Sequence, residues 1–335
     1  MTRSFRLTMC AAVMAGGLMA ARTDAYLKLG TSAGADAISL KWRPGTITYF
    51  VSTSGPAPIA LADFQAAVAR GFGAWNDVQT ATADFQFGGF VANDAFDEDD
   101  VNTIGFVSRP DLTRVLASTG FTYDTRNGEL LEADIFFNAA MAWSTAQDGQ
   151  SGRFDVQSIA THEAGHFLGL GHSALGETER LASGNRRLIA AAAVMFPIAF
   201  SPGNITERTL HADDVAGVSD IYPSSDFRRT TGSIAGHITR DGQGLFGAHV
   251  TAFNLRTREL VANFTLEDNG RYVIAGLEPG LYVVRAEPLN DGDLDSFFDG
   301  VEPDDITFAP RFHDEVVVVP AGGTADDVDI NVGAR

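Results

Sequence analysis

The run HEAGHFLGLGH, which begins at His162, holds three histidines and one glutamate at spacings that suit a single zinc ion. On a helix, His162 and His166 lie on the same face about one turn apart, so both imidazoles can reach one metal. Glu163 follows the first histidine directly and points in another direction. A glutamate in this place suits a general base acting on metal-bound water better than a ligand. The spacing therefore predicts a hydrolytic metal centre.

A glycine and a third histidine complete the pattern H-E-x-x-H-x-x-G-x-x-H. Gly169 lets the chain leave the helix through a conformation that other residues rarely adopt, and the turn brings His172 back toward the metal. Three protein ligands leave the fourth position of zinc open for water, which is typical of catalytic sites. We therefore expect the three histidines to bind Zn²⁺ and Glu163 to serve as the base of a zinc peptidase acting on protein or peptide substrates.

Composition limits the other functions that are open to the chain. Of the 335 residues, 45% are hydrophobic, which is enough for two packed domains. The formal net charge of −19 argues against a nucleic-acid partner, because phosphate binding needs clustered lysine and arginine. The acidic excess is compatible with calcium binding, but its usual meaning is a solvated surface.

Residues 1–25 have the composition of a secretory signal peptide. Arg3 and Arg6 form a charged start, and residues 7–21 are an apolar run without charge. That run is short for a transmembrane helix, so we expect no stable membrane insertion and a secreted, extracellular protein. The single cysteine, Cys10, lies inside this segment, so the mature chain would contain no disulfide.

The segments around the motif alternate between extended and helical patterns. The predicted strands cover residues 46–51, 85–87, 103–107, 115–123 and 131–137. The predicted helices cover residues 61–78, 156–170 and 213–222. A run of strands with a few embedded helices indicates an α+β domain whose sheet lies beside the helix that carries the motif.

An acidic loop lies between two of the predicted strands and contains Asp94, Asp97, Glu98, Asp99 and Asp100. The loop is either a solvated turn or an oxygen-rich calcium site. We favour the solvated turn, because the acidic residues do not follow the spacing of a known calcium loop such as the EF-hand.

Beyond residue 230 the sequence changes to short alternating strands, expected at residues 234–239, 248–253, 260–264, 271–274 and 281–286. Further edge strands are expected at residues 316–319 and 328–330. Turn signals such as Asp241-Gly242 separate the strands. The pattern predicts a small antiparallel β-sandwich over residues 231–335, joined by a linker at residues 224–230. Three scattered histidines in it are interpreted as packing or surface residues: His237, His249 and His313.

Together with the zinc motif, several segments resemble the metzincins, and among them the matrixins, the matrix-metalloproteinase-like enzymes. Ser173 follows the third histidine, as in that group. Residues 193–197 resemble its Met-turn, in which Met195 would form a hydrophobic floor beneath the metal. Residues 210–218 resemble its C-terminal helix, and residues 131–138 resemble its edge-strand region, along which an extended substrate would lie.

This resemblance covers residues 26–223. It implies a metzincin-like domain with a twisted mixed sheet, an active-site helix and a C-terminal helix. It also implies secreted zinc endopeptidase activity, with Zn²⁺ as the cofactor and structural Ca²⁺ as a second ion to be tested. Residues 276–284 are similar to carboxypeptidase-regulatory-like β-sandwich domains.

The chain departs from the matrixin pattern in the connection between the third histidine and the Met-turn. From His172 to Met195 the chain advances 23 positions, which is longer than usual. The extra segment, about residues 176–192, lies where the family forms part of its specificity pocket. Cleavage preference therefore does not carry over from the resemblance.

A second hypothesis places the main function in the C-terminal sandwich. The protein would then be a binding or adhesion protein with a surface or matrix target, and the zinc domain would be accessory. Candidate binding residues lie between the fifth and sixth predicted strands of this region: Asp291, Asp293, Asp295, Phe297, Phe298 and Asp299.

Overall fold

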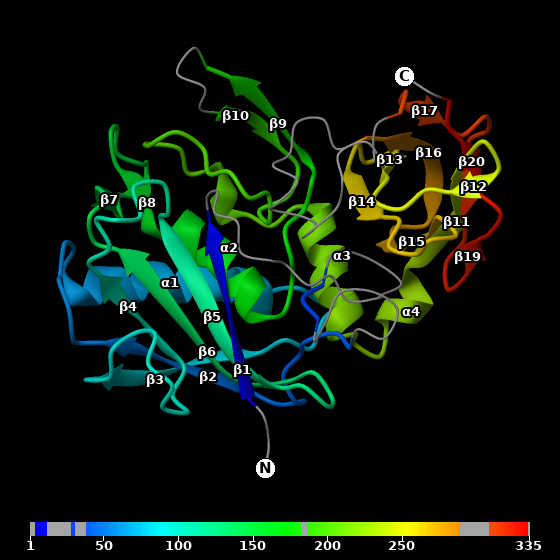
Figure 1. Cartoon of the computed structure of the whole chain (residues 1–335). Helices are drawn as coiled ribbons and strands as arrows, with labels where there is room; N and C mark the ends of the chain where they lie inside the picture. The colour runs from blue at the N-terminus through cyan, green and yellow to red at the C-terminus, as the bar shows by residue number, and fades with distance from the viewer. Residues whose placement is uncertain (1–3, 12–27, 31–37, 182–185, 289–307, 334–335) are drawn as a thin grey trace.

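A computed structural model describes residues 4–11, 28–30, 38–181, 186–288 and 308–333. The described chain begins with a mixed sheet and packed helices and continues into a part built mainly of strands (Figure 1). This arrangement confirms the predicted α+β class. The helices are α1 (Leu61–Asn76), α2 (Val156–Phe167), α3 (Ala212–Ile221) and α4 (Phe227–Thr230), with a 3₁₀ turn η1 (Thr206–Arg208) before α3.

The larger sheet runs in the strand order β1-β5-β6-β4-β2-β3. Four of its strands are parallel, β2, β3, β4 and β6, whereas β5 and β1 are antiparallel to their neighbours. The strands are β1 (Ser4–Ala11), β2 (Ile47–Ser52), β3 (Phe85–Val91), β4 (Thr103–Val107), β5 (Ala117–Asp124) and β6 (Glu129–Asn138). All of the strands expected between residues 46 and 137 thus lie in one sheet.

The expectation that residues 131–138 form the edge of this sheet is wrong. They belong to β6, which lies between β4 and β5. Residues 132–138 are buried without interruption, as is typical of a strand covered on both faces. The strand outside β6 is β5, and β1 pairs with it in antiparallel register along its whole length (Figure 1).

Helix α1 packs directly against α2. Its predicted apolar stripe is buried and includes Phe64, Val68, Phe72 and Trp75. Gly71 brings the two helices close together, since a Cβ at this position would lie 2.9 Å from the Ala160 Cβ. The Trp75 Nε1–H donates a hydrogen bond of 2.9 Å to the Thr161 carbonyl oxygen. These contacts fix α2 against the rest of the core.

The segment 176–192 forms a hairpin of β9 (Gly176–Arg180) and β10 (Arg186–Ala191). It projects from the molecule between the larger sheet and the C-terminal strands (Figure 1). A second small pair, β7 (Trp143–Ser144) and β8 (Phe154–Asp155), leads directly into α2.

The C-terminal strands form two sheets in the described chain, ordered β12-β11-β15, with β19 and β20 also on β11, and β14-β13-β16-β17, with β18 on β16. The sheets share a core that includes Ile234, Ile238, Val250 and Val284. This arrangement agrees with the predicted sandwich, except that β19 and β20 pair with β11 in parallel and not antiparallel register. The strands are β11 (Gly232–Arg240), β12 (Gln243–Gly244), β13 (His249–Asn254), β14 (Leu260–Phe264), β15 (Arg271–Leu277), β16 (Gly280–Glu287), β17 (Arg311–Phe312), β18 (Val317–Val319), β19 (Thr324–Ala325) and β20 (Ile330–Asn331).

Helix α3 belongs to both parts of the molecule. Val218 lies in the core beneath the larger sheet, whereas Ala216 lies in the core of the C-terminal sheets. Gly276 allows this close packing, because a Cβ there would lie 2.9 Å from the Ala216 Cβ. The expected linker at residues 224–230 contains α4, whose Phe227 is buried.

Several expectations fall wholly or partly outside the described residues. Of the proposed signal peptide, residues 1–25, the structure describes only the strand β1. The candidate binding residues between Asp291 and Asp299 lie outside the described chain. Among the described residues, no helix combines the length and the apolar character needed to cross a membrane.

Candidate metal centre

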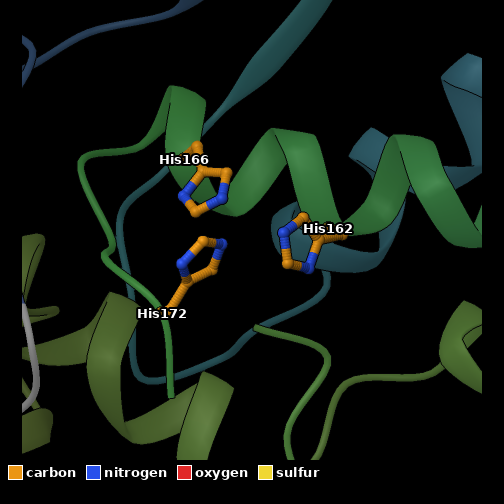
Figure 2. A group of neighbouring side chains, drawn as sticks. All are labelled: His162, His166 and His172. Carbon is orange, nitrogen blue, oxygen red and sulfur yellow. The ribbon is translucent and has the colours of Figure 1, made fainter. Parts of the chain in front are cut away.

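Helix α2 places two of the predicted ligands. It begins after Asp155, whose Oδ2 accepts a hydrogen bond of 2.8 Å from the Ser158 backbone N–H and so caps the helix. Two turns further on, His162 and His166 project from the same face (Figure 2). Both side chains are buried.

The chain turns sharply after α2 and returns the third histidine. Gly169 has a φ of +93°, and a Cβ at this position would collide with the Leu40 carbonyl oxygen. Only glycine meets both conditions without strain, as the sequence predicted. Beyond the turn, His172 points back toward the two helical histidines (Figure 2).

The structure therefore brings the three predicted ligand residues together. The ring centroids of His162 and His166 are 4.7 Å apart, and those of His166 and His172 are 4.8 Å apart. One ligand nitrogen from each ring lies within 4.8 Å of the other two. This cluster is compatible with one zinc ion.

Hydrogen bonds on the far side of two rings orient them for a metal. His162 Nδ1 lies 2.7 Å from the Val194 carbonyl oxygen, and His166 Nδ1 lies 2.9 Å from the Leu170 carbonyl oxygen. Each Nδ1 must then carry the proton, which leaves Nε2 as the lone-pair donor. The Nε2 atoms of His162 and His166 are buried and make no hydrogen bond within the described chain. A cation between the rings would satisfy both atoms.

Burial also keeps these two histidines in the form that binds metals. It lowers the pKa of His162 to about 4, against an ordinary value of 6.5. Burial also lowers the pKa of His166 well below its ordinary value of 6.5, and the neighbouring histidines His162 and His172 add to the effect. Both imidazoles are therefore neutral near pH 7, as metal ligation requires.

Met195, the methionine of the expected Met-turn, packs against the helix that carries two of the three histidines. It is 3% exposed, and a Cβ on Gly165 of α2 would collide with its sulfur atom. Gly165 lies inside the zinc motif, and the absence of a side chain there leaves the space in which Met195 packs against the helix.

Asp214 holds this turn in place, and sequence reasoning gave it no role. Its carboxylate accepts hydrogen bonds from the backbone N–H groups of Val194 and Met195, at 2.9 and 3.1 Å. Because the Val194 carbonyl in turn accepts from His162, one carboxylate in α3 indirectly orients a metal ligand. Two adjacent acidic residues in the first turn of a helix, Asp213 and Asp214, were the available signal.

The predicted base, Glu163, is completely buried beside the histidines. The Thr119 hydroxyl on β5 lies 2.5 Å from its Oε2 atom and donates a hydrogen bond to it. Sequence reasoning did not single out Thr119, because strand position alone does not show which side chain meets α2.

A small cavity of about 30 Å³ lies beside His162. Leu188 of β10 forms part of its wall, so the inserted hairpin does contribute to a pocket next to the metal centre, as expected. Most of the other lining residues are apolar, including Ile159, Val194, Phe196, Pro197 and Ile198. Glu207 also lines the cavity, where burial and then the charge of Asp214 raise its pKa to about 7.

The remaining candidates do not belong to the histidine cluster. All five acidic residues of the loop at residues 94–100 are exposed, which favours the solvated turn. The Phe96 N–H within the loop and the Thr103 N–H at the start of β4 both donate hydrogen bonds to the Asp134 carboxylate. These bonds hold the backbone of the loop. In the C-terminal sheets, His249 is buried with its Nδ1 3.2 Å from the Glu287 carboxylate.

Comparison with known proteins places this geometry in context. A family model described as Matrixin matches residues 41–223, more than half of the chain. The chain is 29% identical to metalloendoproteinase 1-MMP of Arabidopsis thaliana over 54% of its own length and 44% of the relative's. It is 27% identical to the hatching enzyme of Paracentrotus lividus, over 47% of this chain and 28% of that protein. It is also 27% identical to matrilysin of Rattus norvegicus, over 55% and 59%.

Proposed function

Because the chain belongs to the matrixin family, we propose that it is a zinc-dependent endopeptidase that hydrolyses peptide bonds in extended protein substrates. The observation that carries this proposal is the convergence of three buried histidines with Glu163 beside them. The relatives named as metalloendoproteinase and matrilysin support the same activity. The match covers 44% of the length of the Arabidopsis thaliana metalloendoproteinase and 28% of the length of the Paracentrotus lividus hatching enzyme, less than half of each.

The residues of the chain divide the reaction between them. His162, His166 and His172 would hold Zn²⁺, which when bound polarises the scissile carbonyl and makes water more acidic. Glu163 takes a proton from the attacking water as the new C–O bond forms. It then passes this proton to the amine nitrogen as the C–N bond breaks. Burial of the site excludes bulk water and strengthens these interactions.

We propose that substrate adds a strand along β5. This strand is the last one of the sheet before β1, and its pairing with β1 supports the idea that the edge accepts an extended segment. Removal of residues 1–25 as a signal peptide would leave this edge open for a substrate in the same antiparallel direction. A strand-like binding mode favours loops and unfolded segments of proteins.

We further propose that the protein is secreted, on the strength of the charged and apolar pattern of residues 1–25. The C-terminal sandwich, residues 231–335, is proposed to be a carboxypeptidase-regulatory-like domain with a surface or matrix target. The sequence of residues 276–284, at the β15–β16 turn, supports the resemblance. Structural Ca²⁺ stays a prediction of the family resemblance.

Replacing the base tests the proposed activity. We expect Glu163→Gln to keep one zinc per chain and to cleave unfolded casein at least about 100-fold more slowly, because glutamine cannot accept the water's proton. The matched control is Glu315→Gln, the same change at an exposed position in the C-terminal part. Metal analysis and initial cleavage rates would be measured on all three proteins. Normal turnover in Glu163→Gln would refute the assignment.

A further inference from the structure

We propose that Thr119 is a positioning residue for the catalytic base. Its hydroxyl holds one carboxylate oxygen of Glu163, and the other oxygen would act as the base. The inference rests on the proposed function, since it assumes that Glu163 acts on the attacking water.

The contact between the two side chains is short and isolated from solvent. Thr119 Oγ1 lies 2.5 Å from Glu163 Oε2, and both residues are 0% exposed. The same hydroxyl lies 3.3 Å from the Glu163 backbone oxygen, so the side-chain contact is the closer of its two acceptors. A hydroxyl that donates to an ionised carboxylate forms one of the stronger hydrogen bonds found in proteins.

The two ends of this hydrogen bond differ in rigidity. Glu163 lies on α2, but the helix fixes only its backbone, and three side-chain torsions remain to be set. Thr119 is β-branched, which restricts its only torsion, and its strand pairs with β6 along its whole length, independently of residues 1–25. The threonine is therefore the anchor and the glutamate is the group that is held.

This anchoring selects which oxygen can act as the base. An ionised carboxylate only accepts hydrogen bonds, and Thr119 uses the Oε2 atom. In the proposed reaction, Oε1, which lies outside this hydrogen bond, would be the atom that accepts the proton of the attacking water. A proton acceptor held in one orientation keeps the reacting atoms close to the productive geometry.

The position of Thr119 also connects the base to the proposed substrate. Thr119 belongs to β5, the strand along which we expect the peptide to lie. The same strand would therefore align both the scissile bond and the group that activates water. Because neighbouring side chains of a strand point to opposite faces, neither Ser118 nor Gly120 can take over this contact.

Three single variants test the role of the hydroxyl. Thr119→Val keeps the shape of the side chain but removes the donor, whereas Thr119→Ser keeps the donor. Thr48→Val makes the same change at a half-buried position on β2 of the same sheet, away from the proposed substrate strand, and serves as the matched control. For each purified, zinc-loaded protein we would measure kcat and KM for a quenched peptide, the zinc content and the Tm.

We expect Thr119→Val to lower kcat about 10- to 100-fold, with KM within about threefold and one zinc per chain. Thr119→Ser should recover most of kcat, and Thr48→Val should match the wild type. A merely structural role would instead lower the zinc content or Tm without rescue by serine, and this would overturn the inference. If Thr119→Val kept full activity while Glu163→Gln was inactive, the role of Thr119 would be refuted but the proposed function would stand. A zinc-loaded wild-type protein that cleaves nothing would overturn the proposed function as well.

Discussion

Two adjacent carboxylates at the start of α3 hold different parts of the metal centre. Asp214 accepts hydrogen bonds from the Met-turn, as described above. Asp213 accepts one of 2.7 Å from the Ser173 hydroxyl, directly after the third histidine, and one of 2.8 Å from the Ala262 N–H of β14. Burial raises the pKa of Asp213 to about 7, and the charge of Asp214 adds to the effect. This carboxyl therefore changes its charge near physiological pH.

The raised pKa predicts how stability depends on pH. The folded protein binds a proton at Asp213 up to about pH 7, whereas an unfolded aspartate releases it near pH 3.8. The group thus favours the folded state at low pH, and this contribution is lost as pH rises through about 7. In Asp213→Asn the side chain stays neutral. We expect the variant to gain stability relative to the wild type, by about 1–3 kcal/mol between pH 5.5 and 8.5.

Calorimetric unfolding of both proteins at several pH values would check this prediction. A destabilisation of Asp213→Asn that is the same at every pH would contradict it, because it would mean that the carboxyl does not titrate in this range. At the residue scale the sequence predicted that the three histidines come together, since their spacing is fixed by one helix and one turn. It could not predict Thr119 or Asp214, because their contacts join distant segments.

At the scale of elements, the end of α2 determines whether the third histidine reaches the metal. The sequence predicted a helix over residues 156–170, but α2 ends at Phe167. The difference arises at Gly169, whose positive φ ends the helix before the chain passes Leu40. The glycine was recognised from the sequence, but the last helical residue depends on a tertiary contact.

A substitution at this turn should therefore be costly. We expect Gly169→Ala to destabilise the protein by about 2 kcal/mol or more, because it adds a Cβ where φ is positive and the Leu40 carbonyl oxygen leaves no space. The matched control is Gly73→Ala in α1, where nothing lies within 4 Å of the added Cβ. That change should stabilise by about 0.5–1 kcal/mol. Chemical denaturation would give the free energy of unfolding of both variants. Equal changes in the two would contradict the special role of Gly169.

The order of strands was the part of the fold that the sequence did not determine. Strand β4 has the predicted bounds, residues 103–107, and most other strands were found within a few residues. Residues 131–138 were nevertheless placed at the edge instead of in the interior. Residues 132–138 form an unbroken run of buried residues, Glu132 and Asp134 included, as is typical of a strand covered on both faces. The polar residues in this run conceal the pattern of an interior strand.

At the scale of the whole molecule, the two parts are packed together and not merely joined. The Ala262 N–H of β14 reaches Asp213, and Ala262 also packs with Leu175 and Ala193, which flank the inserted hairpin. The sequence indicated two domains but not this contact, because small residues at an interface carry no distinctive pattern. The C-terminal sheets therefore support the segment that follows the third histidine.

The most direct test of the account is a zinc titration of the whole metal-free chain, with cleavage of unfolded casein measured at each step. We expect metal-free protein to be inactive and activity to rise with bound zinc to a plateau at one equivalent per chain. Occupancy of the site by one zinc without any cleavage would contradict the peptidase assignment. Cleavage that persists in metal-free protein would contradict the role of the three histidines.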